Sequence, residues 1–141
     1  MSLDEEDPDL DFDEAGARER LLEAARLFDA GEYHDAHEAW EVLWLKNEGA
    51  DADFFKGLIQ AAICLHHWRD GDQEGARMLY RGHRRYLAAF LPVHRGIDVA
   101  GFLDAMRAAL DPLLRARAGE LVAFPAAGGP RVPFAEEGAN P

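Results

Sequence analysis

The sequence lacks several features that mark other kinds of protein. Cys64 is the single cysteine in 141 residues, so no disulfide can form within the chain, and this composition fits a reducing cytoplasm. No apolar run approaches the roughly 18 residues that a membrane-spanning helix needs. The first 14 residues are acidic and hold no apolar core of the signal-peptide type. We therefore expect a cytoplasmic protein with no membrane partner.

Lysine is also scarce, and the charge is unevenly spread. Only Lys46 and Lys56 are lysines among 15 basic residues, against 27 acids and a net charge of −12. Eight acids and no base lie in residues 4–14, so the rest of the chain holds 19 acids and 15 bases. This balance disfavours nucleic-acid binding. The lysine shortage fits either a salt-adapted protein or an arginine-rich, GC-rich genome, and the sequence leaves both readings open.

What is abundant favours helix. Apolar residues make up 48% of the chain, β-branched residues are few, and Ala, Leu, Arg and Glu are common. We therefore predict an all-α fold, a bundle of five to six helices. Apolar residues spaced by three and four predict helices over residues 14–30, 32–46, 52–69, 73–90 and 99–110. Asp51 and Asp98 are expected to cap the third and fifth helices, and Asp111–Pro112 is expected to start a short sixth helix.

The organisation along the chain predicts one domain with two appendages. Residues 1–13 form an acidic arm that we expect to be disordered, residues 14–117 a single helical domain, and residues 118–141 an extended C-terminal tail. The segment 28–36 aligns with 68–76 at an offset of 40 residues, with aromatic, Gly and Ala positions coinciding. This weak repeat predicts two stacked helical hairpins.

The most distinctive stretch is the predicted second helix. Ala36, Trp40, Leu43 and Trp44 fall on one face, which we expect to be buried. His37 and Glu41 are one turn apart at the edge of that face, so the imidazole and the carboxylate can touch.

Residues 37–44 fit the pattern HxxxExxW, and together with residues 54–60 and 71–76 they resemble the prokaryotic family called domain of unknown function 309. The resemblance covers roughly residues 17 to 92. It implies an all-helical fold and a motif suspected of metal binding, and it implies no established activity.

The motif leaves three hypotheses open. His37 and Glu41 could bind a divalent metal such as zinc, with His67 as third ligand. His67 and Gln60, which lie with Lys56 on a narrow polar stripe of the predicted third helix, are the best candidates for a further ligand. The predicted pocket therefore comprises His37, Glu41, Trp44, Gln60 and His67. The second hypothesis is a structural clasp in which Glu41 orients His37. The third is an acid–base or small-ligand pocket without metal.

The predicted fourth helix carries a basic face at spacings of four, three and one, made by Arg77, Arg81, Arg84 and Arg85. Such a face could bind an anionic ligand or an acidic partner, and the acidic arm could mask it. The alternative is a face that is solvated or paired with neighbouring acids.

The sequence holds no glycine-rich phosphate loop, no Ser–His–Asp arrangement and no CxxC pair. Our leading expectation is an interaction or scaffold module that binds a protein partner or a second copy of itself, with His37 and Glu41 as a clasp. The alternative is a metal-dependent or acid–base site with hydrolysis as a candidate reaction. Whether the protein is an enzyme stays open at this point.

Overall fold

A computed structural model describes residues 13–47 and 49–135. The elements in chain order are α1 (Glu14–Asp29), α2 (Tyr33–Lys46), α3 (Ala52–Arg69), α4 (Gln73–Leu87), the 3-10 turn η2 (Ala88–Phe90), the strands β1 (Val93–His94) and β2 (Ile97–Asp98), and α5 (Val99–Arg115). The all-α prediction is confirmed, with one small antiparallel hairpin that we did not predict. Within the described ranges no helix is long and apolar enough to span a membrane.

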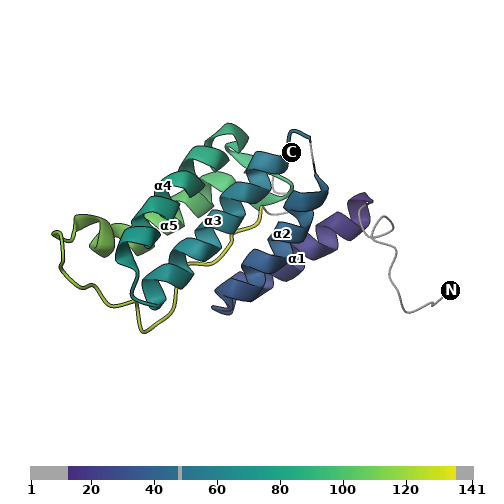
Figure 1. Ribbon diagram of the computed structural model, residues 1–141. Coiled ribbons are helices and arrows are strands. Elements are labelled where there is room, and N and C mark those ends of the chain that lie inside the picture. The colour runs from purple at the N-terminus through teal and green to yellow at the C-terminus, as the bar shows by residue number, and fades with distance from the viewer. Residues whose placement is uncertain (1–12, 48, 136–141) are drawn as a thin grey trace.

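The helices form two layers. Helices α2, α3 and α4 lie side by side, and α1 and α5 lie behind them (Figure 1). Helix α3 is central, because it contacts both α2 and α4 and buries ten of its residues, Phe54, Phe55 and Leu58 among them. The polar side of α3 therefore faces the space between α2 and α4.

The two copies of the internal repeat correspond to two helix ends, those of α1 and α3, that share the same backbone geometry. Gly31 and Gly71 follow α1 and α3 with φ of +82° and +95°, a region that favours glycine. At the first ending the Glu32 N–H donates to Leu27 O, and at the second the Asp72 N–H donates to His67 O. Each set of bonds closes the last helical turn as a Schellman motif, and each Gly turns the chain toward the next helix, which begins two residues later.

The predicted sixth helix is wrong. Helix α5 runs without a break from Val99 to Arg115 and contains Pro112. Its buried face continues through Met106, Leu110 and Leu113, on both sides of the proline. Burial of that face against the bundle outweighs the backbone hydrogen bond that the proline removes.

Asp98 caps α5 as predicted, by accepting from the Gly101 N–H at 2.9 Å, whereas Asp51 makes no side-chain cap on α3. The Asp51 carboxylate accepts instead from His94 Nε2 at 2.9 Å and from Arg95 Nε. Burial raises the pKa of Asp51, but the hydrogen bonds from Arg95 and His94 outweigh burial and lower it overall. The unpredicted hairpin thus uses the residue that local rules assigned to helix capping.

After α5 the chain returns across the bundle in extended form (Figure 1), and we call residues 118–135 the C-terminal strap. Trp68 Nε1 donates to Val122 O at 2.8 Å, and the Val132 N–H donates to Asp29 Oδ1 at 2.8 Å. Asp13, predicted as part of the arm, caps α1 through the Gly16 N–H. The rest of the predicted arm, residues 1–12, and the chain end, residues 136–141, lie outside the described residues.

Candidate functional site

A cavity of about 210 Å³ opens on the three-helix layer, between α2, α3 and α4. It combines polar side chains with apolar walls, and its lining residues are His37, Glu41, Trp44, Lys56, Ile59, Gln60, Ile63 and Leu79. We call it the motif pocket. Four of the five residues predicted as a pocket, namely His37, Glu41, Trp44 and Gln60, lie in it.

His37 and Glu41 are adjacent but only loosely coupled. His37 Nε2 lies 3.8 Å from Glu41 Oε1, and the two side chains are 22% and 43% exposed. This separation is too long for a hydrogen bond, and exposure to water weakens the attraction further. Both groups therefore keep hydrogen-bonding capacity for another molecule.

Lys56 closes the Trp44 end of the pocket. Its ammonium lies 5.5 Å from the Trp44 ring centroid and 5.4 Å from that of Tyr86. These distances suit cation–π attraction, and no carboxylate of the described ranges pairs with this lysine. From the sequence we placed Lys56 on the polar stripe but did not assign it to the site. Its position four residues before Gln60, one helical turn away, could have indicated that it belongs there.

The side chain of Gln60 packs closely against a glycine on the facing helix. A Cβ at Gly82 of α4 would collide with Gln60 Oε1. The side-chain amide therefore lies against the α4 backbone at Gly82, and a larger residue there would push the amide aside and change the depth of the pocket.

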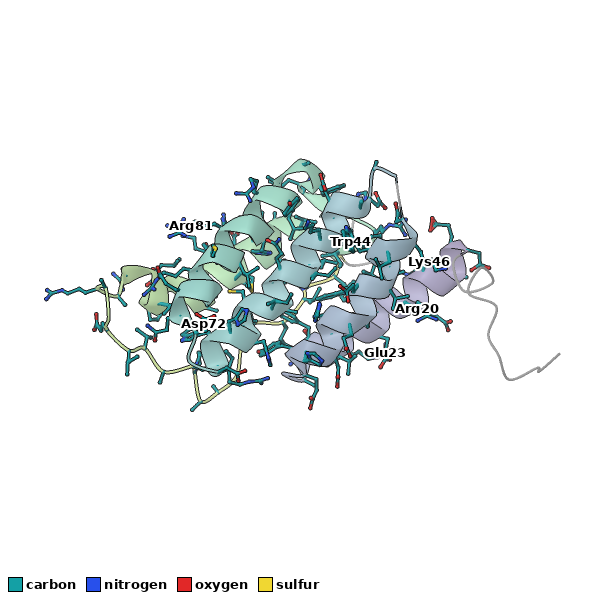
Figure 2. All side chains as sticks on the ribbon, viewed as in Figure 1. Arg20, Glu23, Trp44, Lys46, Asp72 and Arg81 are labelled. Atoms are coloured by element: carbon teal, nitrogen blue, oxygen red, sulfur yellow. The ribbon has the colours of Figure 1, made fainter. Side chains whose placement is uncertain are left out.

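His67 does not join His37 and Glu41. Its Nδ1 lies 3.5 Å from Asp72 Oδ2, beyond the end of the pocket. In Figure 2, Trp44 and Asp72 lie toward opposite ends of the helix layer. Helices α2 and α3 run antiparallel with Lys56 over Trp44 and His66 beside His34, so His67 falls beyond His37. Among residues 13–47 and 49–135, no group of three or more His, Cys, Asp or Glu side chains could hold a metal ion.

The four arginines of α4 serve different purposes. Arg77 Nε donates to Leu113 O and Arg84 Nη1 donates to Leu103 O, so both attach α4 to the backbone of α5. Arg85 lies 5.7 Å from the Tyr86 ring centroid, and Arg81 points away from the bundle (Figure 2). The predicted anion-binding face is therefore not assembled as one cluster.

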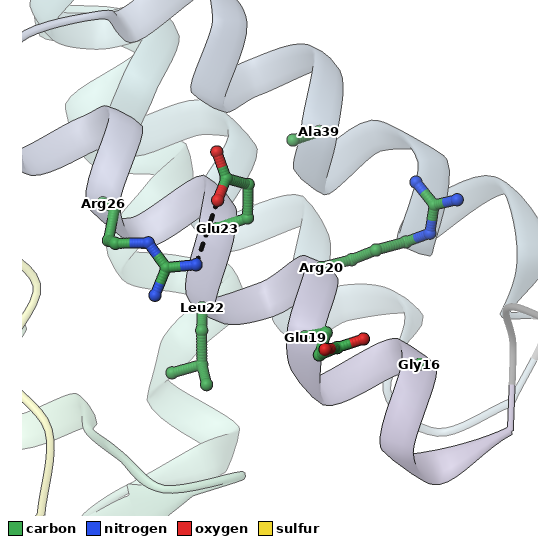
Figure 3. A pocket seen from close by; sticks show the side chains of 7 residues that line it. All are labelled: Gly16, Glu19, Arg20, Leu22, Glu23, Arg26 and Ala39. Carbon is green, nitrogen blue, oxygen red and sulfur yellow. Dashed lines mark hydrogen bonds and ion pairs between the residues drawn. The ribbon is translucent and has the colours of Figure 1, made fainter.

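A larger cavity, about 550 Å³, lies on the outside of α1 against α2. Figure 3 shows Arg20 and the Glu23–Arg26 pair extending to opposite sides of it. Its lining includes no histidine and no aromatic residue. Flexible charged side chains of this kind provide little preorganised chemistry.

The single thiol is inert in this fold. Cys64 is fully buried in α3, and burial raises its pKa to about 12. At neutral pH the thiol therefore stays protonated and unreactive.

Comparison with known proteins confirms the resemblance that the motif predicted. The family DUF309, described as a domain of unknown function, matches residues 21–79, which include α2, α3 and every residue of the motif pocket. An uncharacterized protein of Aquifex aeolicus (strain VF5) is 39% identical over 64 residues, which are 43% of this chain and 19% of that protein. The chain therefore spans about a fifth of the length of this relative. Neither comparison names an activity.

Proposed function

We propose that this protein is an interaction module whose motif pocket receives one side chain of a protein partner. The observation that carries the proposal is the convergence of His37, Glu41, Lys56 and Gln60 on one apolar-walled cavity. These four groups come from two packed helices, His37 and Glu41 from α2 and Lys56 and Gln60 from α3.

The size of the pocket favours a side chain over a larger free ligand. Pockets for drug-sized molecules measure about 300–1,000 Å³. The motif pocket, at about 210 Å³, is smaller and suits one large side chain. Trp44, Ile63 and Leu79 would contact its apolar part.

The polar groups would then select that side chain. Glu41 and His37 lie on α2, and the ammonium of Lys56 lies at the Trp44 end. A partner side chain with a polar tip can hydrogen-bond to these groups while its stem packs on the walls. A second copy of this chain is one candidate partner, and sedimentation velocity across a range of concentrations tests it.

The test is selection of peptides from a displayed random library on the full chain. Peptides that bind the pocket should lose at least about tenfold in affinity to Trp44→Ala, which removes a wall, and to Gly82→Ala, which displaces Gln60. Arg81→Ala is the matched control on the same layer and should bind normally. Circular dichroism and thermal unfolding check that each variant folds.

Failure to select any peptide, or peptides that bind Trp44→Ala and Gly82→Ala as tightly as the parent, would contradict the proposal. Selected peptides that all bind another surface of the protein would also contradict the proposal.

A second candidate function is a metal-dependent or acid–base site at His37 and Glu41. The 3.8 Å approach of an imidazole nitrogen to a carboxylate oxygen supports it. These residues supply two ligands, one fewer than the three protein ligands usual in catalytic zinc sites, so water or a bound molecule would have to complete the coordination.

Elemental mass spectrometry distinguishes the two candidates. The protein is purified without a polyhistidine tag or chelator, beside His37→Ala and Glu41→Gln. Near-stoichiometric metal that is lost in both variants would favour the second function, and a screen of hydrolytic substrates would follow. Metal-free protein whose selected peptides bind the parent chain but bind His37→Ala and Glu41→Gln more weakly would favour the interaction module.

A further inference from the structure

A second cavity lies under the C-terminal strap, where the strap crosses the α1–α2 turn and the end of α3. Its volume is about 400 Å³. Its wall includes charged, aromatic and glycine residues: Asp29, Tyr33, Arg69, Phe124, Gly129 and Arg131. It shares no residue with the motif pocket.

Arg69 is held rigidly in this wall. Its Nη1 donates to Gly31 O at 2.8 Å, and its guanidinium carbon lies 4.8 Å from the Tyr33 ring centroid and 6.0 Å from that of Phe124. In the part of the chain that the structure describes, no carboxylate forms an ion pair with it. A stacked guanidinium with one backbone contact keeps further N–H donors for a planar or tetrahedral oxyanion.

Arg131 supplies a second positive charge from the strap. Its side chain is 79% exposed, and its Nε lies 3.8 Å from Asp29 Oδ2. The other oxygen of Asp29 accepts from the Val132 N–H at 2.8 Å, so this carboxylate is already engaged by the strap. The two arginines and one aspartate of the wall leave a net charge of about +1.

The strap can approach this closely because of a glycine. A Cβ at Gly129 would collide with the Tyr33 hydroxyl. Burial raises the pKa of Tyr33, opposed by Arg69 and by a hydrogen bond with the Gly129 backbone, so the phenol is uncharged at neutral pH and does not repel an anion.

We propose that this cavity binds a small oxyanion, a carboxylate or a phosphate group, between Arg69 and Arg131. The family match ends at residue 79, so the wall formed by Phe124, Gly129 and Arg131 is not part of what that family describes. The site therefore exists only because the strap folds back onto the α1–α2 turn.

The test is a titration of the full chain with inorganic phosphate and, separately, with acetate, followed by ¹H–¹⁵N NMR at constant ionic strength. We expect saturable shifts at the Arg69 side chain and at the amides of residues 128–131. Arg131→Ala should weaken binding about threefold, as expected for one largely exposed charge.

Two further variants make the test independent of folding defects. Asp29→Asn keeps an acceptor for the Val132 N–H but removes the negative charge, so it should tighten binding about threefold. Arg69→Lys keeps the charge but loses the fork and the stacking, so it should weaken binding by about tenfold or less. Arg85→Ala, an exposed arginine of α4, is the control and should leave binding unchanged.

Tighter binding of phosphate identifies a phosphate group as the ligand chemistry, and tighter binding of acetate identifies a carboxylate; either result supports the proposal. Absence of saturable binding by both anions overturns it. So does equal affinity in the parent, Arg131→Ala and Asp29→Asn, or shifts spread evenly over the arginines of α4.

Discussion

His83 is the fully buried polar side chain of the core among the described residues. Its Nδ1 lies 3.3 Å from Gly57 O of α3, and its ring lies 5.4 Å from the Phe102 ring of α5. The carbonyl accepts, so Nδ1 carries the proton in the neutral ring. Burial lowers the pKa of His83 to about 4, although the bond to Gly57 opposes the shift.

This lowered pKa predicts a stability that falls in mild acid. Above about pH 6.5 the imidazole is neutral in both the folded and the unfolded chain. As the pH falls from about 6.5 to 4, the unfolded chain takes up a proton that the folded chain refuses, so the free energy of unfolding drops by about 3 kcal/mol. Urea unfolding at pH 7 and pH 4.5 measures the loss.

The control for this prediction is His83→Gln, which can still donate to Gly57 O but does not titrate. It should be less stable at pH 7 and should lose less stability between pH 7 and 4.5. An identical pH dependence in the parent and the variant would show that His83 is not the responsible group.

At the scale of one element, α5 carries an internal conflict. Pro112 lies in its last turns, where it cannot donate a hydrogen bond and its ring crowds the preceding turn. Leu110 and Leu113, on either side of the proline, are both fully buried, and Arg77 reaches the Leu113 carbonyl at the helix end. Tertiary contacts therefore keep α5 continuous although Pro112 disfavours helix at that position.

Pro112→Ala should accordingly stabilise the protein. An internal proline costs a helix about 3 kcal/mol, and the position near the helix end together with the freer unfolded chain reduces the gain to about 1 kcal/mol. Chemical denaturation measures it. Pro125→Ala in the strap is the control, because that proline lies outside any helix, and it should give no gain. A destabilised Pro112→Ala would mean that the proline itself supports the fold.

At the scale of the whole molecule, the strap covers apolar surface that the helices leave open. Val132 is buried, and Val122, Phe124 and Phe134 pack partly buried against the core. The strap also pairs with the hairpin through the bridge between Ile97 and Phe134. A segment distant in sequence thus closes the bundle across the α1–α2 turn and the end of α3 (Figure 1).

Truncation after residue 117 should therefore lower the free energy of unfolding by roughly 4 kcal/mol, given about 1–3 kcal/mol for each well-buried apolar side chain. Urea unfolding of the full and truncated chains measures the difference. Leu121→Ala is a control within the strap, because Leu121 is 86% exposed, and it should change little. A truncated chain as stable as the parent would show that the strap adds no net stability.

Much of the helical layout could be predicted because its determinants are local. Apolar spacing, the Asp98 cap and the glycines at 31 and 71 act within a few residues of where they stand. The same holds for His37 and Glu41, which one helical turn makes neighbours. The scaffold role and the metal hypothesis stay predictions.

The rest depended on how elements meet. The sequence by itself determined which segments are helices, which faces are apolar and which polar residues share a stripe, because hydrogen bonding and periodicity operate within each segment. Only the tertiary structure decided that Lys56 lies over Trp44 while His67 lies against Asp72. It also decided that Asp51 pairs with a hairpin 43 and 44 residues away. It decided, too, that the strap completes a cavity around Arg69. The register between helices and the direction of each side chain follow from packing many surfaces at once, which no single segment encodes.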